Sequence, residues 1–407
     1  MKNLLLNLTF ISFVSFTLLS CGGDDTNDGD NPTPTITTEY SGVISENTTW
    51  TKENIYTLAG KVVVPSGVTL TIEPGTVIKS YPGQEANACA LIVAKGGKLM
   101  AQGTSSEPII FTTTADQISR DHSSYPGFAN LDETYKGYWG GVIILGNAEI
   151  SADAPQKQIE GIPASDSNGL YGGSDNADNS GVIQYVQIRH GGTLLGDDNE
   201  INGLTLGGVG SGTVIENVEV IGNVDDGIEC FGGSVNISNA LVWAQGDDAF
   251  DIDQSYSGTI DNFMGFADAE SDHALEIDGP EGNMIGMFTM INGTLKGFND
   301  PNINGEYADF RKEATGTVSN TYFYNFSCGS DFEIDGETNT NGAAALTFTA
   351  LEFNTTHLSD TCNNVASEIC DDQTGSGVNF NASDVTAATV GADASAFSGW
   401  SCYFTEN

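Results

Sequence analysis

Acidic residues recur in this sequence beside alternating apolar residues, about two dozen positions apart. A neutral segment at 203–207 (GLTLG) opens the series, and five charged segments follow it, at 227–231 (GIECF), 249–253 (AFDID), 274–278 (ALEID), 309–313 (DFRKE) and 331–335 (DFEID). Carboxylates held close together can coordinate Ca²⁺, which prefers hard oxygen ligands. Paired carboxylates can also serve as the acid and the base of a hydrolysis. The chemistry of this chain therefore depends on whether its fold stacks the segments.

Stacking would give two rows of charge, because side chains alternate across a strand. The first row has Glu229, Asp251, Glu276 and Glu333, with Arg311 among them, and the second has Asp253, Asp278, Glu313 and Asp335. Strands stack about 4.8 Å apart, where two like charges repel by on the order of 3 kcal/mol at an effective dielectric constant of about 20. Bound Ca²⁺, Arg311 or protonation would relieve this repulsion. The alternative is a solvated acidic stripe that salt screens. We take Ca²⁺ as the expected cofactor, with these ligands: Glu229, Asp251, Asp253, Glu276, Asp278, Glu333 and Asp335.

Strands this short cannot bury a face alone, but stacked coils can. The series starts at 203, 227, 249, 274, 309 and 331, so its steps are 24, 22, 25, 35 and 22 residues, and the long step indicates an insertion near 298–307. Further strands recur in phase at 214–218, 235–239 and 259–263. The stretch 62–112 resembles the opening coils of right-handed parallel β-helix proteins. We therefore predict an all-β chain with one right-handed parallel β-helix, a solenoid, over residues 39–407.

The same alternation predicts two inward stacks of apolar side chains. One stack has Ile228, Phe250, Leu275, Phe310 and Phe332, and the other has Cys230, Ile252, Ile277 and Ile334. Lys312 interrupts the second stack, which predicts a local irregularity there. Residues 115–137 and 153–180 fall outside the pattern and are expected to be loops.

A second group of motifs resembles a large family of Bacteroidota β-helix lipoproteins. The motifs are 138–146 (YWGGVIILG), 159–163 (IEGIP), 179–181 (NSG), 188–192 (IRHGG) and 199–210 (NEINGLTLGGVG). The resemblance covers most of the chain and implies the same fold and a cell-envelope location. It implies no particular activity, because the function of that family is largely undefined.

The turns before the acidic segments are similar in register to those of the polygalacturonase family of glycoside hydrolases. The matching stretches are 223–227 (NVDDG), 246–248 (GDD), 272–274 (DHA) and 310–312 (FRK). The likeness implies that Asp226, Asp247 and Asp248 flank a scissile bond, that His273 tunes the acid, and that Arg311 holds a substrate carboxylate. The chain departs from that family at both glycines around the histidine, which are Asp272 and Ala274, and at its lysine, which is Glu313.

The N-terminal segment has the features of a signal for export and for lipid anchoring. Lys2 precedes the apolar stretch 4–19, and Cys21 follows Leu-Leu-Ser as in a lipobox. We predict a signal peptide at 1–20, with a diacylglyceryl thioether on Cys21. A short membrane anchor is the alternative, although a span needs about 20 apolar residues. The acidic tether at 21–38 resembles the surface-export signal of Bacteroidota lipoproteins; the alternative is an ordinary periplasmic spacer. We therefore expect an outer-membrane lipoprotein at the cell surface.

The amino-acid composition excludes some classes of ligand. The 407 residues include 55 acidic and 13 basic ones, a formal net charge of −42, which argues against nucleic acid and anionic lipid as ligands. Four histidines and no Cys-x-x-Cys make a zinc site improbable.

Cys362 and Cys370 form the best candidate disulfide, whereas Cys230 lies in a core register. Tyr256, in a turn after Asp253, is a candidate exposed platform for sugar.

Two functions follow from these observations. The first is a cell-envelope lipoprotein that binds Ca²⁺ and glycan through the acidic rows. The alternative is a carbohydrate-active enzyme, a polygalacturonase-like hydrolase or a polysaccharide lyase, that uses the aspartates at the turns. Fold alone does not choose between them.

Overall fold

The computed structural model describes residues 35–407 except 85–86, 195–199, 301, 304, 335–345, 359–369 and 372–378. The predicted signal peptide, Cys21, Cys362 and Asp335 lie outside the described residues, so the predicted Cys362–Cys370 disulfide does as well. Cys328 is disulfide-bonded, and Cys89, Cys230 and Cys402 are buried free thiols. No helix of the described part is long and apolar enough to cross a membrane.

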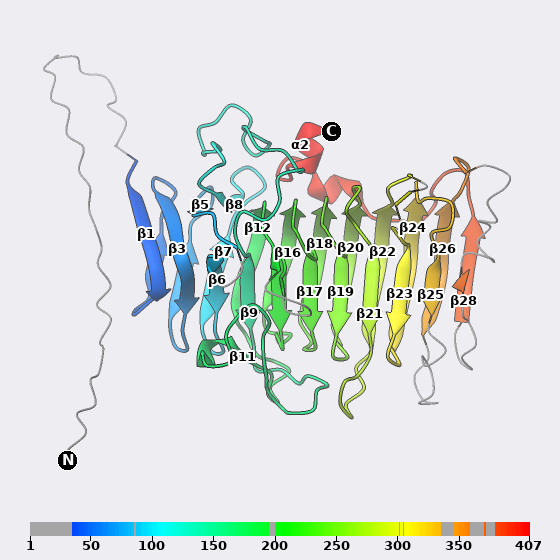
Figure 1. Ribbon diagram of the computed structural model, residues 1–407, viewed down its shortest axis with the longest axis horizontal. Coiled ribbons are helices and arrows are strands. Elements are labelled where there is room, and N and C mark those ends of the chain that lie inside the picture. The colour runs from blue at the N-terminus through cyan, green and yellow to red at the C-terminus, as the bar shows by residue number, and fades with distance from the viewer. Residues whose placement is uncertain are drawn as a thin grey trace, which may run out of the picture.

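The chain is a parallel β-helix, as the spacing of the short strands predicts. Figure 1 shows strands of successive coils lying side by side, from β1 at one end of the long axis to β28 at the other. The first coils contain the ten-residue strand β3 (Ile55–Val64) together with shorter strands: β1 (Thr37–Val43), β2 (Thr48–Trp50), β4 (Thr69–Ile72), β5 (Val77–Ser80), β6 (Ala90–Val93), β7 (Lys98–Gln102), β8 (Ile109–Thr113) and β9 (Val142–Leu145).

Later coils each contain one long and one short strand. The long strands are β12 (Gly181–Arg189), β16 (Val214–Ile221), β18 (Asn236–Trp243), β20 (Thr259–Phe266), β22 (Phe288–Lys296), β24 (Gly316–Tyr324), β26 (Thr347–Asn354) and β28 (Asn379–Asp384). The short strands are β15 (Leu204–Gly207), β17 (Ile228–Phe231), β19 (Phe250–Asp253), β21 (Leu275–Asp278), β23 (Ala308–Arg311), β25 (Phe332–Ile334) and β27 (Cys370–Asp371). All pairings between coils are parallel, and the short strands form one continuous face.

Asparagines make the corner at which the long strands from β16 to β24 bend. Asn217, Asn239 and Asn262 have φ of 57°, 55° and 58°, a left-handed conformation that asparagine tolerates better than most residues. Their side chains also bond from coil to coil: Asn239 Nδ2 donates to Asn217 Oδ1 at 3.0 Å, and Asn262 Nδ2 donates to Asn239 Oδ1 at 2.6 Å. The corners are therefore linked along the axis of the solenoid.

The core contains the predicted inward residues, with one correction of register. Ile277 pairs with Phe310 and Asp278 pairs with Arg311, two positions away from the predicted alignment. Phe310 therefore belongs to the second stack, between Ile277 and Ile334, and Ala308 fills the first. The predicted interruption at Lys312 is wrong, because this residue lies beyond the end of β23.

Two excursions cover opposite sides of the solenoid (Figure 1). The loop between β8 and β9, which includes the predicted loop at 115–137, lies beside the C-terminal helix α2 (Tyr403–Glu406). The region 153–180 is not only loop: it contains η2 (Ser167–Gly169) and a hairpin of β10 (Lys157–Gln158) and β11 (Leu170–Tyr171). A smaller hairpin pairs β13 (Thr193–Leu194) with β14 (Glu200–Ile201). The C-terminal segment also contains η3 (Ala394–Phe397).

Candidate functional site

Five carboxylates from five successive coils stand in one row on the face of the short strands. The strand registers pair Glu229 with Asp251, Asp251 with Glu276, Glu276 with Asp309, and Asp309 with Glu333. We call these five residues the acidic row. The predicted row placed Arg311 where Asp309 stands. The shift by two residues kept the alternation of inward and outward positions, so the sequence pattern could not reveal it.

In the described part of the chain, the second row contains Asp253 and Asp278 but not Glu313. Asp278 is paired in register with Arg311, and Asp253 precedes Asp278 on the neighbouring coil. Glu313 is not part of this row, because it follows the end of β23 with φ of 59°. Earlier positions of the row are occupied by Gly207 and Phe231, which pair with each other.

The sequence predicts that the acidic row faces solvent. This prediction is wrong for much of the row, which is covered. Glu229, Asp251 and Asp309 are only 6%, 9% and 7% exposed. The hairpin β10–β11 covers the early coils, and the ring of Tyr171 packs on Gly207, where a Cβ would come within 2.9 Å of the ring. Burial, followed by repulsion from Asp251, raises the pKa of Glu229 well above its ordinary value. Burial and then Asp253 do the same to the pKa of Asp251.

The turns that lead into β17 and β19 add a second acidic group. Asp225, Asp226 and Asp247 each offer an oxygen, and the three atoms lie within 4.8 Å of one another. Burial, and then the Asp247 carboxylate, raise the pKa of Asp225 to about 8. Asp226 is almost fully buried and accepts a hydrogen bond from the backbone N–H of Asp248 at 3.0 Å. Two consecutive coils therefore contribute acids to one point.

His273 lies among carboxylates of three coils. Its Nδ1 is 2.9 Å from Asp248 Oδ1 and 3.4 Å from Glu276 Oε2, and its Nε2 is 3.8 Å from Glu306 Oε2. The backbone N–H of His273 also donates to Asp248 Oδ1 at 2.8 Å. Burial is the main reason that the pKa of Asp248 is raised, and Asp247 adds to it. The structure thus brings Asp226, Asp247, Asp248 and His273 together, as their sequence spacing suggested.

Arg311 is also near this cluster, but acids of the protein surround it. Its Nε lies 2.8 Å from Asp278 Oδ1 and 3.5 Å from Asp309 Oδ2, and its Nη2 contacts Glu276. Lys312 Nζ contacts Asp278 as well. Arg311 therefore neutralises the later coils of both rows, which leaves its guanidinium little freedom to hold a substrate carboxylate.

The sequence analysis did not single out three acids of the site, which are Glu306, Asp309 and Asp331. Glu306, Asp331 and Glu333 offer oxygen atoms within 4.8 Å of one another. Burial, and then Asp331, raise the pKa of Glu306 to about 8. Glu306 lies in the insertion that lengthens one coil, so only the bridge between His273 and Glu306 reveals its position. Asp309 was missed for the reason of register given above.

An open groove of about 440 Å³ adjoins the turn acids. Its lining includes Leu194, Val224, Asp225, Asp247 and Asp272. Asp247 and Asp272 are exposed there, whereas Asp226 and Asp248 are buried. The predicted aromatic platform is wrong: Tyr256 is fully buried, and its hydroxyl donates to the backbone oxygen of Val235 at 2.6 Å.

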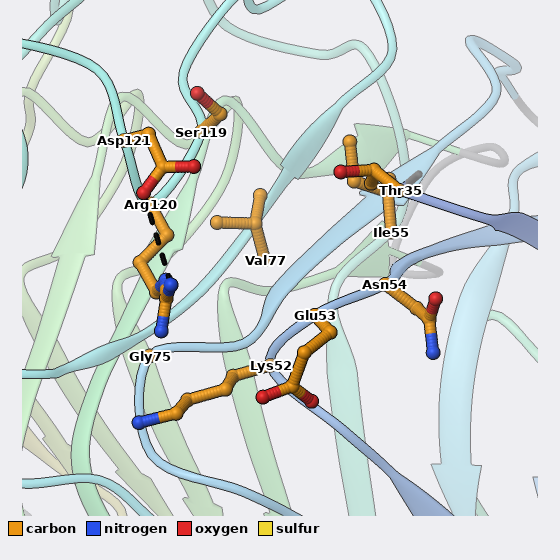
Figure 2. Close-up of a pocket in the computed structure, with 10 residues that line it drawn as sticks. All are labelled: Thr35, Lys52, Glu53, Asn54, Ile55, Gly75, Val77, Ser119, Arg120 and Asp121. Carbon is orange, nitrogen blue, oxygen red and sulfur yellow. Dashed lines mark ion pairs between the residues drawn. The ribbon is translucent and has the colours of Figure 1, made fainter. Parts of the chain in front are cut away.

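A separate pocket of about 350 Å³ opens near the first coils (Figure 2). Lys52 and Arg120 line it together with Glu53 and Asp121. Lys52 Nζ pairs with Glu107 Oε1 at 3.0 Å, and Arg120 lies 3.8 Å from both Glu107 and Asp121. Since its cations are already paired with acids, this pocket offers less specific chemistry than the groove.

The comparison with protein families agrees with the architecture, and the comparison with solved structures gives one similar chain. The chain is similar to the catalytic unit of a thermostable GH87 alpha-1,3-glucanase from Streptomyces thermodiastaticus strain HF3-3, at 13% identity and a TM-score of 0.33. The match covers 86% of this chain and 65% of that one, so it spans less than two thirds of the glucanase unit. No curated protein matches the chain. The family model described as a pectate-lyase-like β-helix domain matches residues 42–404. The chain therefore belongs to the pectate-lyase-like β-helix domain family.

Proposed function

We propose that this protein is a lipoprotein of the outer membrane, displayed at the cell surface, that binds Ca²⁺ and, with its help, glycan. The observation that carries the proposal is the acidic row together with the turn acids beside the groove. Diacylglycerol on Cys21 would hold the protein in the membrane, and the tether at 21–38 would hold the β-helix away from it.

Repulsion among the carboxylates supports cation binding. Three oxygens within 4.8 Å of one another can all contact one Ca²⁺ ion, because Ca–O bonds of about 2.3–2.6 Å place opposite ligands about 5 Å apart. Such an ion would replace protonation as the means of holding these acids together. Asp225 and Asp247 supply this chemistry at the wall of the groove, where an incoming ligand can share the ion.

The open groove supports a glycan as that ligand. A Ca²⁺ ion at Asp225 and Asp247 keeps coordination positions for sugar hydroxyls or for a uronate carboxylate, which the acidic wall alone would repel. The groove lacks the exposed aromatic residue that we predicted at Tyr256, so binding would rely on the cation and on hydrogen bonds.

Binding to a panel of glycans, with Ca²⁺ and with excess EGTA, tests this function. We expect at least one glycan to bind only with Ca²⁺, and Asp247→Asn to weaken that binding at least tenfold. Asp121→Asn, in the separate pocket of Figure 2, is the matched control and should bind as the unaltered protein does. Binding that EGTA does not change, or no binding to any glycan, would contradict the proposal.

The anchor needs its own test. Labelled palmitate should enter the full-length protein and should not enter Cys21→Ser. Protease added to intact cells should remove the labelled protein from the surface, while a periplasmic marker survives. Survival of the protein until the outer membrane is opened would place it on the inner side.

The arrangement around His273 favours one second candidate, a glycoside hydrolase. Asp248 is a buried acid with a raised pKa that His273 contacts, and Asp247 is exposed to the groove. This pair has the character of an acid and a base in different surroundings. Release of reducing ends from a polysaccharide panel, lost in Asp248→Asn, would support the hydrolase; equal inactivity of both proteins would favour the binding protein. A lyase needs a basic residue to take a proton from the sugar, and Arg311 is the candidate. A lyase is less well supported, because Arg311 already forms ion pairs with carboxylates of the protein.

A further inference from the structure

We propose that a second, buried Ca²⁺ site lies under the covered end of the acidic row, separate from the groove. Its ligands would be Asp226, Glu229, Asp251, Asn202 and Thr205. The proposal rests on the Ca²⁺ binding of the proposed function but needs no glycan, and it assigns to this ion a structural role.

Three carboxylates of this site are close together and shielded from water. Asp226, Glu229 and Asp251 each offer an oxygen within 4.8 Å of the other two. Their exposed fractions are 7%, 6% and 9%. Water therefore screens these charges poorly, and each carboxylate that ionises repels the other two at short range.

Two neutral oxygens complete the arrangement. Thr205 pairs in register with Glu229 on the preceding coil and points to the same side, because Leu204 and Leu206 face the core. The amide nitrogen of Asn202 donates a hydrogen bond to Glu229, so its amide group lies beside that carboxylate. Asn202 and Thr205 are each only 2% exposed.

Both neutral oxygens and one carboxylate oxygen of this site lack hydrogen-bond partners. Among the residues that the structure describes, no hydrogen-bond donor reaches Asn202 Oδ1, Thr205 Oγ1 or Asp251 Oδ1. Burying a polar group without a partner is unfavourable, so three such groups beside one carboxylate cluster indicate a missing ligand. A cation would satisfy all three at once, because it accepts electron pairs from oxygen and also offsets the charge of the carboxylates.

The set of ligands favours Ca²⁺ over other cations. Carboxylate, amide and hydroxyl oxygens are hard ligands, and neither histidine nor cysteine sulfur is among them. Mg²⁺ keeps several of its waters, which a site with so little solvent access accommodates poorly. Ca²⁺ accepts six to eight ligands in variable geometry and suits side chains brought together from three coils.

The position of the site suggests what the ion does. Asn202 and Thr205 come from the coil of β15, Asp226 and Glu229 from that of β17, and Asp251 from that of β19. The hairpin β10–β11 packs on the same coils beside this point, with Tyr171 on Gly207 and its hydroxyl bonded to Gln254 at 3.1 Å. One ion would therefore join three consecutive coils at this buried point, and it would exchange slowly.

The first test measures tightly held metal in the purified full-length protein. After gel filtration without added calcium, elemental analysis should find one Ca²⁺ per chain. Prolonged EGTA treatment should remove it and lower the melting temperature, and Ca²⁺ should restore that temperature where equimolar Mg²⁺ does not. A protein that holds no metal, and whose melting temperature is the same with EGTA and with Ca²⁺, would overturn the proposal.

Substitutions locate the ion. Thr205→Val removes the hydroxyl at nearly constant volume, and we expect it to weaken the tight Ca²⁺ at least tenfold while the metal-free protein melts no earlier. Glu229→Gln should abolish tight binding and raise the melting temperature of the metal-free protein, because it removes repulsion. Thr317→Val, on β24 far along the solenoid, is the matched control and should leave Ca²⁺ affinity unchanged. Unchanged affinity in both Thr205→Val and Glu229→Gln would refute the site.

The outcomes separate this inference from the proposed function. Tight Ca²⁺ without any Ca²⁺-dependent glycan binding would uphold the buried site and reject the glycan. Ca²⁺-dependent glycan binding that Asp247→Asn weakens, without a tightly held ion, would uphold the proposed function and reject the buried site. The absence of both would reject both.

Discussion

Asp309 lies directly beside Glu276 on neighbouring strands, and Arg311 forms ion pairs with both carboxylates. The arginine thereby supplies to the later coils the positive charge that the early coils lack. Glu229 and Asp251 have no cation of the protein within ion-pair distance in the part of the chain that the structure describes, which is where we propose the buried Ca²⁺.

Removal of Arg311 should expose the repulsion that it relieves. In Arg311→Gln, the carboxylates of Glu276, Asp278 and Asp309 lose their guanidinium partner. We expect the free energy of unfolding to fall by about 2 kcal/mol, less than for a fully buried pair because Arg311 is 32% exposed. Urea denaturation at low salt measures the loss. A fall of no more than that seen for Lys157→Gln, a surface lysine, would contradict the expectation.

Glu219 should make stability depend on pH. Its carboxylate is fully buried, and it accepts hydrogen bonds from the backbone N–H groups of Cys402 and Tyr403 and from Trp243 Nε1. Burial still raises the pKa of Glu219 to about 7, against the lowering effect of these donors and of Arg189.

The direction in which stability changes with pH follows from the proton that Glu219 retains in the folded chain. Below the ordinary glutamate pKa both states are protonated, and the full stability is present. Between that value and about 7, the unfolded chain has lost the proton, so unfolding becomes easier as pH rises, by about 1.4 kcal/mol per pH unit. Glu219→Gln should flatten this part of the curve of urea-unfolding free energy against pH. Glu216→Gln, on the same strand, is the control; equal slopes in the two variants would show that Glu219 does not titrate.

The asparagine corners can be tested with a pair of substitutions. Asn239 has φ of 55°, donates to Asn217 and accepts from Asn262. Asn239→Ala loses both bonds and keeps the unfavourable φ, so we expect a loss of about 2 kcal/mol. Asn239→Gly loses the bonds but accepts the φ, so its loss should be about 1 kcal/mol smaller. Thermal unfolding ranks the two variants, and the opposite order would contradict the role of the corner.

The thiol of Cys230 should be inert in the folded protein. It is fully buried between Leu206 and Ile252 in the second inward stack, and burial raises its pKa. We expect a soluble alkylating reagent to label Cys230 only after denaturant is added. Mass spectrometry of digested native and denatured samples locates the label, and Cys89 and Cys402, which are also buried free thiols, serve as internal comparisons. Rapid labelling of Cys230 in the native sample would show that the stack opens.

The sequence by itself determined the architecture and most of the acidic row. Apolar and acidic residues alternate with period two within strands and recur at the length of one coil, so Ile228, Phe250 and Leu275 had to face inward and Glu229, Asp251 and Glu276 outward. These are local rules, and every coil repeats them, which is why a single sequence was enough.

Only the tertiary structure decided the register at β23, the cover over the row and the position of Arg311. A shift of two residues preserves the period-two alternation, so Asp309 and Arg311 were equally acceptable beside Glu276 until the insertion before β23 was placed. The burial of Glu229 depends on segments that pack onto the solenoid from elsewhere in the chain, and that of Tyr256 on how its turn folds into the core of the solenoid. Such contacts arise from shape and long-range packing, and no repeat within the strands encodes them.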